Sequence, residues 1–222
     1  MGKSIRIINA WVVAVGLSAV NCQAALVTSS SSLTPSTVID FQQFTTLAIA
    51  DAIPVQVGTP VGWDVEVFGI GNDTYIGPVS HSLGSNGSWN STSDPSFYSA
   101  RLPVGTSLAM DFVFNTMPVM GVGGFMNYAP GYGPVLIEAY DASGTLLESH
   151  EISTVAPIST PGGLNQGAFR GILRTSADIT TFRLAGGYAV IDNLAFIGVP
   201  EPASIFCLGM GGACLFKRKR KG

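Results

Sequence analysis

The sequence predicts an all-β fold, a single sandwich of two sheets with a jelly-roll-like topology. Short segments that alternate hydrophobic and polar residues recur about every eight to twelve residues along the middle of the chain. Turn-forming residues separate these segments, and the chain contains 27 Gly and 13 Pro. Inside this region no stretch sustains the helical period of about 3.6 residues. The three observations together favour a β-sandwich over a helical or mixed fold.

The strands follow from this alternation, taken in chain order. Residues 51–62 are rich in Pro and Gly and are expected to be a connection, and residues 69–99 are expected to hold one short strand or a functional loop. Asp-Ala-Ser-Gly at 141–144 predicts a hairpin turn, with Gly in the left-handed position. The expected strands are 38–41, 63–68, 108–114, 117–126, 135–140, 146–152, 167–172, 179–184 and 188–197.

The first 24 residues have the pattern of a signal peptide. Lys3 and Arg6 precede an apolar run over 7–20, and small residues at Cys22 and Ala24 predict that signal peptidase cleaves after Ala24. The alternative, a lipoprotein acylated on Cys22, is disfavoured because Asn precedes the cysteine. Residues 25–37 are rich in Ser and Thr and are expected to be a flexible lead-in to a sandwich domain over 38–198.

Residues 199–222 combine a rigid polar element, a short apolar segment and a basic cluster. The apolar segment, 203–216, would span about 21 Å as a helix against a hydrocarbon core of about 30 Å, which makes it a marginal membrane helix. Basic residues are retained on the cytoplasmic side, so the polar element is expected on the outer side of the membrane. The residues of the polar element and the basic cluster are Val199, Pro200, Glu201, Pro202, Lys217, Arg218, Lys219, Arg220 and Lys221.

These three parts, in this order, resemble the PEP-CTERM sorting signal, also catalogued as the ice-binding protein C-terminal domain. The resemblance implies export in a Gram-negative bacterium, recognition by an exosortase and removal of the tail near Pro-Glu-Pro. It also implies display on the cell surface or in an exopolysaccharide matrix. The alternative is an ordinary membrane anchor or a chance hydrophobic end. Residues 110–198 loosely resemble the β-sandwich cargo of such proteins, which is similar to carbohydrate-binding jelly rolls.

Charge and cysteine usage limit the partners of the segment 25–198. It has four basic residues, all Arg, and thirteen acidic residues, which gives a net charge of −9. This charge excludes nucleic acid and direct electrostatic binding of acidic polysaccharides, because both need a basic patch. A neutral glycan, or an acidic one bridged by a divalent cation, remains open. All three Cys lie outside this segment, so a disulfide, a thiolate nucleophile and a Cys-ligated metal are excluded from it.

Two kinds of site are expected in the sandwich. Aromatic faces that stack on sugar rings lie in Gly- and Asn-rich loops near Asn86, Asn90 and Asn127, with packing against the core as the alternative. The aromatic candidates are Trp89, Tyr98, Tyr128 and Tyr132. The jelly-roll resemblance implies a structural calcium between the first and last strands. Its candidate ligands are Asp40, Asp192 and Asn193, which would otherwise face water or cap a turn.

Catalysis is not expected. The sequence has no Gly-x-Ser-x-Gly elbow, and His81 and His150 lack the spacing of a zinc site. Asp64 and Glu66 on one strand face are more typical of a solvated edge than of a glycosidase. The expected role is therefore that of a structural or adhesive surface protein that binds a glycan. A non-binding or self-associating scaffold is the alternative, and a secreted hydrolase is the least favoured interpretation.

Overall fold

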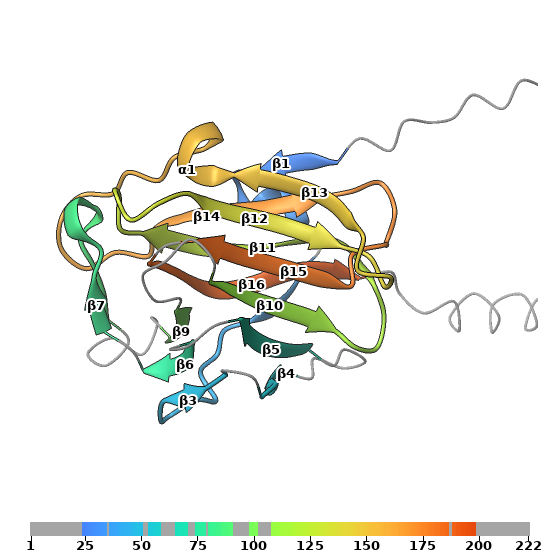
Figure 1. Ribbon diagram of the computed structural model, residues 1–222, viewed down its shortest axis with the longest axis horizontal. Helices are drawn as coiled ribbons and strands as arrows, with labels where there is room; N and C mark the ends of the chain where they lie inside the picture. Colours follow the sequence, from blue (N-terminus) through green and yellow to red (C-terminus); the bar gives the residue numbers. More distant parts are fainter. Residues whose placement is uncertain are drawn as a thin grey trace, which may run out of the picture.

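The structure is a computed structural model, and it describes most of the region between the two ends of the chain (Figure 1). The described residues are 24–34, 36–50, 53–58, 65–70, 74–78, 80–90, 98–101, 108–186 and 188–198. For residues 65–70, 81, 90 and 98–101, only the backbone is described.

Within these residues, two antiparallel sheets pack face to face (Figure 1). The eight-stranded sheet has the order β1 (Ala25–Val27), β14 (Ala168–Leu173), β11 (Val119–Tyr128), β16 (Ala189–Gly198), β9 (Tyr98–Arg101), β6 (Tyr75–Pro78) and β3 (Ala48–Ile49), with β2 (Thr37–Ile39) also paired to β16. The six-stranded sheet has the order β13 (Leu146–Glu151), β12 (Val135–Tyr140), β15 (Thr181–Gly186), β10 (Ala109–Phe114), β5 (Val65–Ile70) and β4 (Val55–Gly58). A small hairpin, β7 (Ser80–Ser82) with β8 (Ser88–Asn90), stands apart. The short helical turns are η1 (Ser30–Leu33), η2 (Gly84–Asn86) and α1 (Ile152–Val155).

Strands β9 to β16 have jelly-roll topology. The chain passes from one sheet to the other at every step except the β12–β13 hairpin, which stays in the six-stranded sheet. The result is two four-stranded layers, β14-β11-β16-β9 and β13-β12-β15-β10, inside the larger sheets. The strand pairings within these two layers are antiparallel, as expected for two interlocked Greek keys. The all-β prediction and its jelly-roll form are confirmed.

The core fills the space between the two sheets. On β15 the buried residues alternate with half-buried ones, so Phe182 and Leu184 point inward while Arg183 points outward. Phe112 on β10 lies with its ring centroid 6.3 Å from that of Phe182, and the core also joins both sheets through Phe114 and Phe196, 5.1 Å apart edge to face. The four Phe side chains are almost completely inaccessible to solvent, and burying one such side chain stabilises the fold by roughly 1.5–3 kcal/mol.

The pairing of β11 with β16 is the most extensive in the eight-stranded sheet. It runs from Val119 opposite Gly198 to Tyr128 opposite Ala189. Two irregularities interrupt it: β11 has an extra residue between Val119 and Gly121, and β16 has an extra residue opposite the step from Gly123 to Phe125. Asn193 adopts the left-handed conformation there, with φ of 51°. Asn tolerates this conformation better than most residues do, so the local sequence favours a bulge at this position.

Three expectations about the first half of the chain are corrected. The lead-in over 25–37 is not simply flexible, because β1 joins the edge of the sheet and Leu33 of η1 is fully buried. The connection over 51–62 contains β4, whose Val57 is buried. The segment 69–99 contains the end of β5, all of β6, β7, η2 and β8, and the start of β9. These short elements lack the length that makes alternation readable in a sequence.

The helices expected at the two ends, over the signal peptide and over 203–216, lie outside the described residues. Among the helices that are described, none is long and apolar enough to cross a membrane.

Candidate functional site

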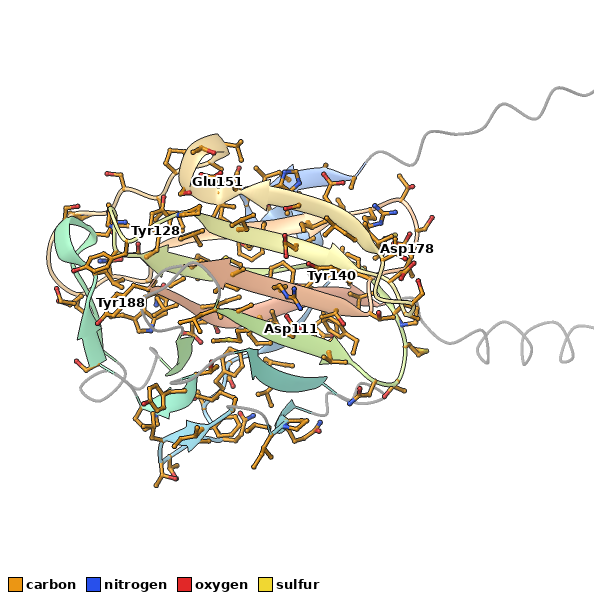
Figure 2. All side chains as sticks on the ribbon, in the orientation of Figure 1. Asp111, Tyr128, Tyr140, Glu151, Asp178 and Tyr188 are labelled. Atoms are coloured by element: carbon orange, nitrogen blue, oxygen red, sulfur yellow. The ribbon has the colours of Figure 1, made fainter. Side chains whose placement is uncertain are left out.

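Several loops meet where β11 ends and β16 begins. We call this region the tyrosine end, defined as residues 83–89, 127–133, 158–167 and 188. The β7–β8 hairpin is attached to the β13–β14 connection, because the Ser88 amide donates to the carbonyl of Gly163 at 2.8 Å. The loop after β11 is attached to the start of β16 in the same way, since the Ala129 amide donates to the Tyr188 carbonyl at 3.1 Å. Figure 2 shows Tyr128 and Tyr188 together at this end of the sandwich.

A network of amide side chains holds these loops together. The Asn86 side-chain amide donates to the Asn127 side-chain oxygen at 3.1 Å and to the carbonyls of Tyr128 and Ile158, each at 3.0 Å. The Asn86 carbonyl in turn accepts from Thr160 and from Asn165 side chains, each at 2.8 Å. Asn86 and Asn127 are both buried. Their polar groups are therefore used to fix the loops and do not face a ligand.

Two of the aromatic candidates are part of the core. Trp89 is fully buried in a cluster with Leu83, Ala129 and Val190. Tyr128 is 5% exposed, and its hydroxyl accepts a hydrogen bond from the Ile158 amide at 3.0 Å. A ring that stacks on a sugar needs an open face, so the expectation is corrected for these two residues and the packing alternative holds. The side chain of Tyr98 lies outside the described residues.

Tyr132 is the candidate that faces solvent, and it has a partner that the sequence did not single out. Its side chain is 50% exposed, and its ring centroid lies 5.7 Å from that of Tyr188, with the ring planes 30° apart. Tyr188 rests on the buried cluster that contains Trp89. The cluster therefore supports half-buried Tyr188, and through it the exposed ring of Tyr132. The contact between Tyr132 and Tyr188 joins two loops about 56 positions apart in the chain, and no local sequence signal predicts such a contact.

A second polar group lies on the outer face of the six-stranded sheet (Figure 2). Arg183 on β15 is directly opposite Asp111 on β10 and Glu138 on β12. Its guanidinium makes a two-pronged ion pair with the Asp111 carboxylate, at 2.6 and 2.8 Å, and lies 4.8 Å from the Tyr140 ring centroid. The ion pair raises the pKa of Arg183, while burial and then a hydrogen bond to Glu138 raise the pKa of Tyr140. The alternation of Asp111 and Arg183 with large apolar residues indicates outward positions, but their pairing follows only from the topology.

Two of the three candidate calcium ligands, Asp192 and Asn193, lie at the β11–β16 bulge. Asp192 is 2% exposed, and its carboxylate accepts from the Asn193 backbone amide at 2.7 Å and the Asn193 side chain at 3.3 Å. Burial, and secondarily the charge of Asp40, raises the pKa of Asp192 to about 8. Asp40 is exposed and accepts from the Gln42 amide at 3.2 Å. Across the described part of the chain, His, Cys, Asp and Glu form no group of three that could hold a metal.

The residues of the two processing signals lie at the borders of the fold. Ala24, after which signal peptidase is expected to cleave, directly precedes β1. The tail residues 199–202 and 217–221 lie outside the described residues, and β16 ends at Gly198 immediately before them.

Comparison with known proteins bears on this tail. No curated protein matches the chain. Residues 198–221 match the family model of the PEP-CTERM protein-sorting motif, a range that coincides within one residue with the expected signal. That motif implies processing by an exosortase. The chain is therefore an exported protein that carries a PEP-CTERM sorting motif and is sorted by an exosortase to the cell envelope or surface.

Proposed function

We propose that this protein is a structural or adhesive component of the cell surface or exopolysaccharide matrix, and that its sandwich binds a neutral glycan. The signal peptide is removed by signal peptidase after Ala24. The apolar segment 203–216 then holds the chain transiently in the inner membrane until an exosortase removes the tail. The observation that carries the glycan-binding role is the contact of exposed Tyr132 with half-buried Tyr188, which packs against a buried cluster.

The chemistry of the tyrosine end suits a sugar. A half-exposed aromatic ring offers an apolar face to the C–H face of a pyranose, and a second ring at 30° extends that surface. The loops that carry the rings are fixed by the buried amide network, so little conformational entropy is lost on binding. The net charge of −9 over 25–198 favours a neutral glycan over an acidic one.

The proposal includes no catalytic step. A glycosidase needs two carboxyl groups across a bond to be cut, one of them free to act as base or nucleophile. On the outer sheet face, Asp111 is held in an ion pair by Arg183, and the Glu138 carboxylate accepts from the Tyr140 hydroxyl at 2.6 Å. Both carboxylates are thus engaged in structural contacts.

The test is co-sedimentation of the processed protein with the exopolysaccharide of its own host. Replacing Tyr132 with Ala is expected to weaken binding about tenfold, since one aromatic contact contributes roughly 1–1.5 kcal/mol, with the melting temperature unchanged. Tyr132→Phe keeps the ring and should bind as the unaltered protein does. Leu146→Ala is the matched control, because Leu146 is also 50% exposed but lies at the start of β13, outside the tyrosine end.

Two outcomes would contradict the proposal. Saturable binding that is insensitive to Tyr132→Ala would place the glycan elsewhere. No binding at all would favour the second function, a non-binding or self-associating scaffold, which sedimentation velocity of the same sample would reveal as oligomers. New reducing ends in the incubated polysaccharide would show that the protein is a hydrolase.

A further inference from the structure

The sorting motif begins where the central strand of the sheet ends. β16 runs from Ala189 at the tyrosine end to Gly198, and Gly198 is paired with Val119 at the opposite end of the same sheet. Ten residues of strand cover about 30 Å. The motif starts at residue 198, so the fold and the motif share a residue and no linker separates them.

The loops around Gly198 form an end of their own, which we call the tail end and define as residues 115–118, 141–145, 174–178 and 198. Backbone hydrogen bonds connect the chain segments at this end to the neighbouring strands. The Arg174 amide donates to the carbonyl of Met120 on β11, and the Thr180 amide donates to the carbonyl of Tyr140 on β12, each at 2.9 Å. Figure 2 shows Asp178 at this end and Tyr188 at the other.

The path from the sheet to the apolar segment is short. From Gly198 to Ala203 the chain makes five steps, which reach about 17 Å when fully extended. The tyrosine end lies about 30 Å from Gly198 along β16. A bilayer that holds the segment 203–216 must therefore lie near the tail end, and the four intervening residues are too few to bring the tyrosine end to the membrane first.

The beginning of the domain reaches the same end of the sheet. Ala25 on β1 is paired with Leu173 on β14, Leu173 with Gly121 on β11, and Gly121 with Ile197 on β16. The residue after the expected signal-peptide cleavage and the residue before the motif thus lie in one row across the sheet. Three strand spacings separate them, about 14 Å. Both processing sites therefore border the tail end.

We propose that the tail end is a membrane-facing surface: while the motif is attached, it rests on the lipid headgroups, and the tyrosine end with its Tyr132–Tyr188 pair is presented outward. What the outward end binds rests on the proposed function, and the orientation rests on the strand register together with the membrane insertion of 203–216 that the proposed function includes. The tail end has the chemistry of a surface in contact with headgroups. Arg174 and Asp178 form a two-pronged ion pair at 2.6 and 2.9 Å, and the Asp141 carboxylate accepts from Ser143 and Thr145. Such polar groups stay at the interface and do not enter the hydrocarbon.

The test places a single fluorescent donor at either end of the full chain and measures energy transfer to acceptor-labelled lipid headgroups in phosphatidylethanolamine–phosphatidylglycerol vesicles. Ala142→Cys labels the tail end and Ser85→Cys labels the tyrosine end; both replace small, exposed residues in turns. The three natural cysteines, at 22, 207 and 214, are first replaced with Ala. Transfer from position 142 is expected to be several-fold more efficient than transfer from position 85.

Equal transfer from the two positions would show a sandwich lying flat on the membrane. Stronger transfer from position 85 would show the reverse orientation. Either result overturns the proposal, and so does the absence of transfer from both positions. A second pair, Thr175→Cys and Ser159→Cys, repeats the comparison at independent positions in case one variant fails to fold. The measurement is also made with Tyr132→Ala. The orientation must persist there, so a failure of glycan binding and a failure of the orientation are distinguished.

Discussion

Asp192 is the most unusual single residue in the described part of the fold. Its side chain is almost completely buried on the central strand, where a carboxyl group is costly to ionise. Its carboxylate accepts two hydrogen bonds from the neighbouring Asn193, which is held in the left-handed conformation at the bulge. We interpret Asp192 as the residue that fixes this bulge. Because its pKa is raised to about 8, it is largely protonated at neutral pH in the folded chain.

This residue predicts a pH dependence of stability. An unfolded Asp has a pKa of about 4, so between about pH 4 and the folded value of about 8 the folded chain holds a proton that the unfolded chain has lost. The free energy of unfolding therefore falls as the pH rises through this range. Asp192→Asn keeps the shape and removes the titration, so its stability should fall less with pH. Denaturant titrations of both proteins at several pH values measure the difference.

Equal pH slopes in the two proteins would show that Asp192 does not titrate in this range. The same titrations with calcium and with chelator test the other interpretation of Asp192 and Asp40. If calcium stabilises the unaltered protein above pH 7 but does not stabilise the Asp192→Asn variant, the Asp192 carboxylate is ionised and bound to the metal. Asp192 is then not a buried protonated acid.

At the scale of elements, the loops of the tyrosine end depend on Asn86. Its side-chain amide makes three buried hydrogen bonds to groups on β11 and on the β13–β14 connection. Asn86→Ala leaves these acceptors without their donor and is expected to cost roughly 3 kcal/mol of stability. Asn86→Asp should cost more, because an oxygen would then face three acceptors. Chemical denaturation measures both changes.

The matched control is Asn115→Ala at the exposed tail end, which should change stability by no more than about 0.5 kcal/mol. A similar small effect from Asn86→Ala would mean that the amide network does not hold the loops, and the support assigned to the Tyr132–Tyr188 pair would be lost with it.

Elements differ in how far the sequence predicts them. The β12–β13 hairpin was predictable because its signal is local: Asp141 accepts from the Ser143 amide at 2.9 Å and Gly144 has φ of 78°, as Asp-x-x-Gly requires. β12 and β15 were predictable from alternation, whereas β11 and β16, buried along most of their length, were predictable as apolar runs between turn residues. The burial of Trp89 was not, because its neighbours Leu83, Ala129 and Val190 come from three separate segments. β1 was missed because three residues carry no period.

The same limit applies to the candidate site. Composition located the aromatic and amide residues of the tyrosine end, but it could not separate buried Asn86 and Trp89 from exposed Tyr132. The ion pair of Asp111 with Arg183 spans 72 positions and follows from strand order, which alternation does not specify. By contrast, the sorting motif is linear, and a linear motif is read from the sequence without knowledge of the fold.

At the scale of the whole molecule, the fold limits where the chain can be processed. β16 is the central strand of the eight-stranded sheet, paired along its length with β11 and in parts with β9 and β2, and its last residue is paired with Val119. Cleavage before Gly198 would remove part of this strand and expose its neighbours. Cleavage after it leaves the sandwich intact, which the position of Pro-Glu-Pro at 200–202 allows.

Intact-mass measurement of the protein extracted from the cell surface tests this limit. The mature form is expected to begin at Ala25, the first residue of β1, and to end near Pro200 to Pro202, so that neither cleavage removes a residue of a paired strand. A double substitution of Pro200 and Pro202 with Ala should leave the tail attached, because the rigid element that the exosortase reads is lost, while the melting temperature of the sandwich stays the same. A mature protein that still carries the basic cluster 217–221 would contradict processing at the motif. A C-terminus before Gly198 would show instead that the end of β16 opens before the enzyme cuts.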